Sequence, residues 1–205
     1  MTKPTLIYFG DPMCSWCYGF SPELSKVLEE LSDTIDFEMV MGGLRPYGTQ
    51  SMGELKSFLT HHWEEIGQLT NQSFKYDILD ADLLYDTEPS SRAVVVARHL
   101  KPSCVLDYFK EAQYGFYAEN NAPNEVATFV QIAEKFGIDG KKFQRLFESD
   151  SIKQATKKEF EYAGEMGVRG FPSLVLSVNG QGYLLSSGYT KAADIQAKIE
   201  QILKR

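Results

Sequence analysis

The stretch from Leu6 to Tyr18 constrains the fold of this chain more than any other. It opens with an apolar, aromatic-rich run at 6–9, which predicts a buried strand. Gly10-Asp11-Pro12 then breaks the pattern, and Cys14-Ser15-Trp16-Cys17 begins a helical pattern that extends to about Leu31. A strand, a turn, two thiols and a helix, in that order, are typical of a reactive cysteine pair.

The chemistry follows from the start of the helix. The first backbone N–H groups of a helix lack intrahelical partners and carry partial positive charge, so they stabilise a thiolate. Free cysteine titrates at about 8.5, and in such a setting at roughly 3.5–7.5. We therefore predict that Cys14 is an exposed nucleophile and that Cys17, about one turn further along, attacks a mixed disulfide formed on Cys14. Ser15 and Trp16 are expected to tune both sulfurs.

Two other interpretations of the cysteine pair are less favoured. A zinc site needs four ligands at characteristic spacing. The other candidate ligands are the isolated Cys104 and the histidines His61, His62 and His99, which form no second ligand pair. Two merely structural cysteines would not be expected directly after a strand-to-helix turn. We expect a redox-active dithiol, no bound metal, and a buried structural role for Cys104.

A second informative stretch runs from Gly167 to Gly180. Pro172 stands at the head of an apolar run, Ser173–Val178, and proline fits the first position of a strand because it cannot donate a ladder hydrogen bond. Asn179-Gly180 is the strongest two-residue hairpin signal. We therefore predict a returning strand over 182–187 and a closing helix over 191–203.

Together these motifs resemble the thioredoxin superfamily, specifically its DsbA-like branch, in which a long helical segment interrupts the thioredoxin fold. The chain is most similar to cytoplasmic DsbA-like proteins, also called FrnE-like or predicted protein disulfide isomerases. These are related to kappa-class glutathione transferases and hydroxychromene carboxylate isomerases. The resemblance covers essentially the whole chain and predicts an α/β, thioredoxin-like fold with a large all-helical insertion.

The resemblance also implies roles for individual residues. Cys14 would be the attacking thiol, Cys17 the resolving thiol and Pro172 a cis-proline that faces them. The backbone of Phe171, with Gly170, would pair with an extended substrate peptide and help to keep metals off the thiols. No cofactor would be bound, and glutathione would act as a co-substrate.

One position departs from the family pattern. Many thioredoxin-like proteins carry a buried carboxylate six residues before the nucleophile, where it assists proton transfer from the inner thiol. That position is Tyr8 in this chain, and the nearest acid, Asp11, falls in the turn. The proton acceptor for Cys17 is left open between water and a neighbouring hydroxyl.

Composition limits the partners and the location. The chain has 205 residues, and 21 Lys and Arg against 28 Asp and Glu give a net charge of −7, which argues against nucleic acid or an anionic membrane as a partner. No signal-peptide pattern follows Met1, and no run approaches the roughly 20 apolar residues of a membrane span. We expect a cytoplasmic protein whose dithiol cycles rather than a disulfide framework.

The rest of the chain predicts one interrupted domain. A strand over 35–41 and a loop over 42–48 complete the first part of a thioredoxin-like domain at 1–48 and 167–205, with Arg45 in the loop as a candidate ligand for a substrate carboxylate. Residues 49–166 form the inserted helical domain. The expected helices begin near 51, 87, 103, 124, 139 and 150, with a long loop at 71–84 and an inward face that includes Leu55, Phe58, Leu59, Trp63 and Ile66.

Three functions are compatible with these patterns. The favoured one is a thiol–disulfide oxidoreductase, a protein disulfide reductase or isomerase that acts on protein or peptide disulfides and exchanges with glutathione or another cellular dithiol. The alternatives are a glutathione-dependent transferase or isomerase of small aromatic compounds, which would survive the loss of Cys17, and a holdase-type chaperone, which would need neither cysteine.

Overall fold

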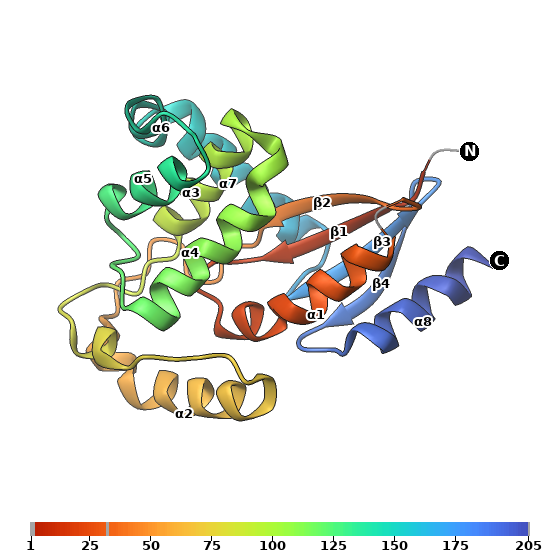
Figure 1. The fold of residues 1–205 in the computed structure, drawn as a ribbon, viewed down its shortest axis with the longest axis horizontal. Coiled ribbons are helices and arrows are strands. Elements are labelled where there is room, and N and C mark those ends of the chain that lie inside the picture. Colours follow the sequence, from red (N-terminus) through yellow and green to blue (C-terminus); the bar gives the residue numbers. More distant parts are fainter. Residues whose placement is uncertain (1–2, 32, 205) are drawn as a thin grey trace.

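A four-stranded sheet forms the centre of the protein in the computed structural model, which describes residues 3–31 and 33–204 (Figure 1). The strand order is β2-β1-β3-β4. Its members are β1 (Thr5–Gly10), β2 (Asp36–Met41), β3 (Ser173–Val178) and β4 (Gln181–Ser187). Strands from the two ends of the chain therefore lie side by side in one sheet.

The pairing follows from the connections. β1 and β2 are parallel because the helix α1 (Ser15–Leu31) crosses between them, whereas β3 runs antiparallel to both β1 and β4. Asn179 and Gly180 link β3 to β4 with φ values of 51° and 83°. A two-residue hairpin turn of this kind requires positive φ at both central residues, so the predicted hairpin is confirmed.

The helices lie around this sheet. α1 and α8 (Ala192–Leu203) contact each other along one face, and the remaining helices fall between β2 and β3 in sequence. Figure 1 shows α3 to α6 gathered at the end of the sheet away from the chain termini. The inserted elements are α2 (Met52–Thr70), η1 (Asp77–Asp80), α3 (Glu88–Leu100), η2 (Pro102–Cys104), α4 (Val105–Glu119), α5 (Val126–Lys135), α6 (Gly140–Phe147) and α7 (Asp150–Glu165).

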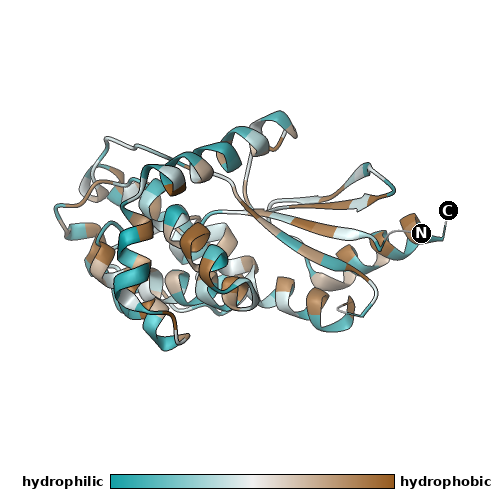
Figure 2. Cartoon of the chain, turned by 90° about the horizontal axis from the view of Figure 1, so that it is seen from above, coloured by the Kyte–Doolittle hydropathy of each residue, from teal (hydrophilic) through white to brown (hydrophobic). Residues whose placement is uncertain are grey.

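Successive side chains of β1 point to opposite faces of the sheet, so the core has two sides. Leu6 and Tyr8 point toward α1 and α4, and Ile7 and Phe9 point toward the end of α7, where Ala163 covers them. Figure 2 shows hydrophobic stretches along the strands and alternating hydrophobic and hydrophilic stretches along the surrounding helices. Among the described residues, no helix is both long enough and apolar enough to cross a bilayer.

The thioredoxin-like fold is confirmed, and two local expectations are corrected. Phe58, assigned to the inward face of α2, is 55% exposed, because that face is already filled by Leu55, Leu59 and Trp63. The stretch at 71–84 is not uniformly irregular, since η1 forms there and buries Ile78 and Leu79. The division of the chain into two domains at 48/49 and 166/167 stays a prediction.

Candidate active site

The two sulfurs of the cysteine pair lie at the start of α1, and all three cysteines are free thiols. The backbone N–H of Cys14 donates to the Asp11 carbonyl at 3.0 Å, which closes the turn after β1. The N–H of Cys17 donates to the Cys14 sulfur at 3.3 Å. This contact is the helix-start interaction expected for a reactive thiol, because the N–H group stabilises negative charge on the sulfur.

The loop before β3 completes the centre from the other end of the chain. The Cys14 thiol donates to the Phe171 carbonyl at 3.5 Å, and the Phe171–Pro172 peptide bond is cis. The Pro172 carbonyl accepts the N–H of Gly188 at 2.7 Å, and the Ser173 hydroxyl donates to the Gly170 carbonyl at 2.8 Å. The first of these hydrogen bonds ties the loop to the residue after β4, and the second closes the loop on itself.

Cys14 is less accessible than the sequence suggests. Only 4% of its surface is exposed, so the expectation of an exposed nucleophile is wrong for the protein with a reduced cysteine pair. The reason is tertiary, since the Phe171 carbonyl from the loop before β3 lies against the sulfur. Cys14 still has the greater access of the pair, because Cys17 is 0% exposed.

Tyr8 contacts the inner thiol. Its side chain is fully buried in β1, and its hydroxyl interacts with the Cys17 thiol in the direction that favours ionisation of Cys17. Burial and the neighbouring Cys14 raise the pKa of Cys17, whereas the Tyr8 hydroxyl and the backbone N–H of Asp11 lower it. Burial also raises the pKa of Tyr8 well above 10. Tyr8 therefore keeps its proton and is not a base.

Asp11 is a fully buried carboxylate beside the thiols. It accepts the backbone N–H of Met13 at 2.9 Å and that of Leu44 at 2.7 Å, and the hydroxyls of Thr87 and Ser91 stabilise its charge. Burial raises the pKa of Asp11 to about 6, and the two backbone N–H groups, together with the nearby hydroxyls, limit the rise. One side chain thus joins the cysteine turn, the loop after β2 and the start of α3.

The loop at 42–48 borders the site, as predicted. An added Cβ at Gly42 would lie 2.0 Å from the Phe171 ring, so glycine is required for this close approach. The Arg45 guanidinium donates to the Gln50 side chain at 2.7 Å and lies over the Tyr85 ring, 5.9 Å from its centroid. Arg45 is half-buried there, and Tyr85 beneath it donates its hydroxyl to the Met13 carbonyl at 2.5 Å.

The two residues between the cysteines have different surroundings. Ser15 is the first residue of α1, and both Ser15 and Trp16 are half-buried. The Trp16 ring lies 6.4 Å from that of Tyr189, which follows β4, and Tyr189 in turn packs against Phe20. Trp16 therefore connects the cysteine turn to the loop after β4.

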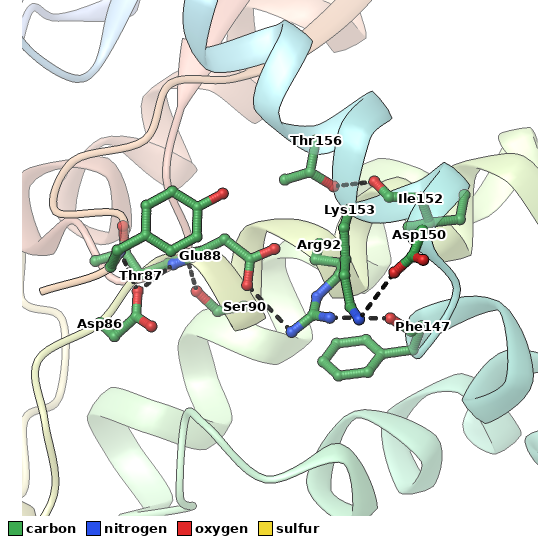
Figure 3. Close-up of polar contacts among 11 residues, drawn as sticks. Asp86, Thr87, Glu88, Ser90, Arg92, Phe147, Asp150, Ile152, Lys153 and Thr156 are labelled. Atoms are coloured by element: carbon green, nitrogen blue, oxygen red, sulfur yellow. Dashed lines mark hydrogen bonds and ion pairs between the residues drawn. The ribbon is translucent and has the colours of Figure 1, made fainter.

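The start of α3 forms a polar cluster next to the loop at 42–48 (Figure 3). Glu88 and Arg92 make a largely buried ion pair at 3.1 Å, and Arg92 also donates to the Phe147 carbonyl and stacks on the Phe147 ring at 4.1 Å. Thr87, which ends the preceding segment, accepts the N–H of Arg45 at 3.1 Å. The cluster holds the start of α3 in place, and Thr87, directly before this helix, lies close to Asp11.

The family resemblance implied that the proline faces the cysteines, but part of their environment was not predicted from the sequence. Counting six residues back from Cys14 identified Tyr8 as unusual, and the structure brings it to Cys17. Asp11 was assigned to the turn without a role, and Tyr85 was not singled out. Their signal was weak, because each depends on contacts with residues distant in sequence.

In the part of the chain that the structure describes, no group of three or more His, Cys, Asp or Glu side chains is arranged to hold a metal ion. Cys104 is buried, and its thiol donates to the Lys101 carbonyl at 3.2 Å. Burial raises the pKa of Cys104, which favours the unreactive thiol.

Comparison with known proteins finds a matching family and a curated relative of this chain. A family model described as thioredoxin matches residues 8–196. Among curated proteins, the ClpXP adapter protein SpxH of Halalkalibacterium halodurans is 21% identical over 196 residues, which is 91% of this chain and 64% of that relative. The chain therefore spans less than two thirds of the length of this curated relative.

Solved structures give the more extensive matches. A proposed protein disulfide isomerase of Nitrosomonas europaea is 31% identical, with a TM-score of 0.92 over 99% of this chain and 98% of that one. The cytosolic disulfide reductase DsbM of Pseudomonas aeruginosa is 27% identical, with a TM-score of 0.81 over 98% of each chain. DsbM has also been solved with GSH.

Proposed function

Because this chain belongs to the thioredoxin family, in its DsbA-like branch, we propose that it is a thiol–disulfide oxidoreductase that reduces or isomerises disulfides in proteins or peptides. Cys14 is the nucleophile and Cys17 the resolving thiol. The observation that carries the proposal is the convergence of the Cys17 N–H and the Phe171 carbonyl on the Cys14 sulfur. That sulfur thus has a stabilising donor and lies against backbone from the other end of the chain.

The reaction balances as a two-step exchange. The Cys14 thiolate attacks a substrate disulfide, forms a mixed disulfide and releases the first substrate thiol. Cys17 then attacks the Cys14 sulfur, which forms the Cys14–Cys17 disulfide and releases the second substrate thiol. Two electrons pass from the dithiol to the substrate, and a second dithiol or two glutathione molecules restore the reduced pair.

The neighbouring residues have matching roles. Gly170 and Phe171 offer backbone to an extended substrate, Pro172 positions that backbone against the thiols, and Ser15 and Trp16 tune the sulfurs. Arg45 binds a carboxylate of the substrate or of glutathione, which its half-buried position beside the site and its pairing with a neutral amide support.

Location and direction follow from the same reasoning. We place the protein in the cytoplasm, in keeping with the cytosolic reductase DsbM, which it resembles over nearly its whole length. A glutathione pool near or below about −220 mV keeps the resting pair reduced. Reductase or isomerase action then follows, and not net oxidation. Glutathione is the proposed co-substrate, which the GSH-bound form of DsbM supports.

The decisive experiment is a redox titration of the Cys14–Cys17 pair against glutathione, combined with insulin reduction by the wild type and by Cys17→Ser. A defined two-electron midpoint, and loss of insulin reduction in the variant, are the expected results. If no Cys14–Cys17 disulfide forms at any poise, the proposal fails and a glutathione transferase becomes the better interpretation. A chaperone that only holds unfolded chains would prevent aggregation equally well in Cys14→Ser.

A further inference from the structure

The inner thiol needs a source of charge stabilisation that the proposed reaction does not by itself provide. Cys17 is 0% exposed, so solvent cannot stabilise its thiolate, and burial raises its pKa. Yet Cys17 must lose its proton before it can attack the mixed disulfide, because the thiolate is the nucleophile. A group that donates a hydrogen bond to this sulfur would therefore act directly on the resolving step.

The titratable side chains around Cys17 come from three elements. Cys14 at the start of α1 opposes ionisation of Cys17, and Tyr117 on α4 lies near enough to interact with it. Tyr8 on β1 favours ionisation, and Tyr8 and Cys17 belong to one buried cluster in which neither side chain reaches solvent. The backbone N–H of Asp11 is the second favourable donor.

The position of the Tyr8 hydroxyl is built into the fold. The ring stacks on Phe20 at 6.3 Å and meets Phe109 edge-on at 5.8 Å, so it is held from two sides. Gly10 leaves the space that the phenol occupies, because an added Cβ there would lie 2.6 Å from the ring and 2.7 Å from the hydroxyl. The tyrosine ring and its hydroxyl are thus held in one position before the reaction begins.

We propose that Tyr8 is a catalytic hydrogen-bond donor for the resolving step, whose hydroxyl stabilises the Cys17 thiolate as it attacks the mixed disulfide on Cys14. This inference rests on the proposed function. The Cys17 sulfur forms a bond to the Cys14 sulfur, the bond from Cys14 to the substrate sulfur breaks, and the electron pair leaves with the substrate thiolate. The proton that Cys17 gave up ends on that thiolate through solvent. Tyr8 keeps its own proton throughout.

Single-turnover kinetics with oxidised glutathione test this role. Reduced enzyme is mixed with oxidised glutathione and quenched with acid, and mass spectrometry follows formation of the Cys14–glutathione mixed disulfide and its conversion to the Cys14–Cys17 disulfide. We expect Tyr8→Phe to leave formation unchanged and to slow conversion roughly tenfold to a hundredfold, the effect of losing one hydrogen bond to a charged group. Raising the pH should restore part of the loss, because more Cys17 ionises.

Two further variants separate a specific effect of the Tyr8 hydroxyl from a general effect on the structure. Tyr108→Phe removes the hydroxyl of another fully buried tyrosine, whose partner is the Phe129 carbonyl, and it should leave conversion unchanged. Gly10→Ala keeps the Tyr8 hydroxyl but pushes it from its place, so it should slow conversion in the same direction as Tyr8→Phe.

The outcomes separate the two proposals. If the wild type forms neither a mixed disulfide nor a Cys14–Cys17 disulfide, the oxidoreductase itself is overturned. If the wild type completes both steps and Tyr8→Phe converts at the same rate, only the role of Tyr8 is overturned. Equal slowing of both steps, or equal slowing in Tyr108→Phe, would also overturn it, because either result indicates a general structural defect.

Discussion

The sulfur of Cys14 lies 3.5 Å from the carbonyl oxygen of Phe171, although the two residues are 157 positions apart in the chain. The contact exists because β1 and β3 are antiparallel neighbours in the sheet. The turn after β1 and the loop before β3 therefore meet at the same end of the sheet. The helices between β2 and β3 do not separate the two halves of the site. Its geometry therefore depends on the pairing of strands from both ends of the chain.

The two cysteines should give different trapping behaviour. Cys17→Ser should accumulate a mixed disulfide between Cys14 and its substrate, because attack still occurs and resolution does not. Cys14→Ser should form none. Non-reducing gels and mass spectrometry after exposure to an oxidised peptide would measure both. Cys104→Ser is the matched control and should behave as the wild type, and trapping through Cys104 would contradict its assigned structural role.

Gly42 and Phe171 should show strong coupling. In Gly42→Ala the new methyl group would overlap the Phe171 ring, displace the loop before β3 and lower kcat/KM about tenfold or more. Removing the ring in Gly42→Ala/Phe171→Ala should recover much of the loss that Gly42→Ala causes, so the two changes should be far from additive. A double-mutant cycle on disulfide reduction measures this coupling. Additive effects would show that the ring contact does not position the site.

Local sequence rules predicted the elements whose signals are themselves local. The hairpin follows from Asn179-Gly180 because only residues tolerant of positive φ fit its turn. The start of α1 follows from the break at Gly10-Asp11-Pro12, and the loop beside the site from the Gly42-Gly43 pair. Each signal lies within a few residues of its consequence.

The features that were missed depend on tertiary contacts. The burial of Cys14 comes from the Phe171 carbonyl, and the environment of Asp11 comes from Leu44 and Thr87. Phe58 fits the helical period of α2 yet lies outside the core, because periodicity gives a direction on a helix and not the width of its buried face. None of these contacts is visible at short range in the sequence.

Asp11 should make stability depend on pH in the acid range. Burial raises the pKa of Asp11 from 3.8 to about 6, so the native state holds a proton that the unfolded chain releases between these values. Stability from this group is therefore lost as the pH rises from 3.8 to 6 and is constant above that, a change of about 3 kcal/mol.

Urea unfolding of the wild type and Asp11→Asn between pH 4 and pH 7 measures this effect. The variant lacks the carboxyl group at every pH and can differ in stability for that reason alone, so the informative quantity is the change of the difference with pH. Relative to the variant, the wild type should lose up to about 3 kcal/mol of unfolding free energy over this range. A difference that stays constant with pH would show that Asp11 titrates normally.

The exposed edge of β2 should depend on one ion pair for its stability. Arg98 on α3 donates to the Met39 carbonyl, Glu159 on α7 accepts the N–H of Met41, and the two side chains pair with each other. They thus satisfy backbone groups at the free edge of the strand, as a neighbouring strand would. Arg98→Met should lower the free energy of unfolding by about 2 to 4 kcal/mol, because it leaves Glu159 largely buried without its partner.

Lys157→Met provides the matched control for this loss. Lys157 pairs with Glu161 on the same helix as Glu159, but their side chains are 62% and 55% exposed. Solvent screens such a pair, so its removal should cost less than about 1 kcal/mol. Denaturant unfolding of both variants, with the reduction potential of the cysteine pair as a second readout, tests the comparison. Equal losses would show that the edge of β2 needs no such cover, and a changed potential in Arg98→Met would show that β2 transmits its disturbance to the thiols.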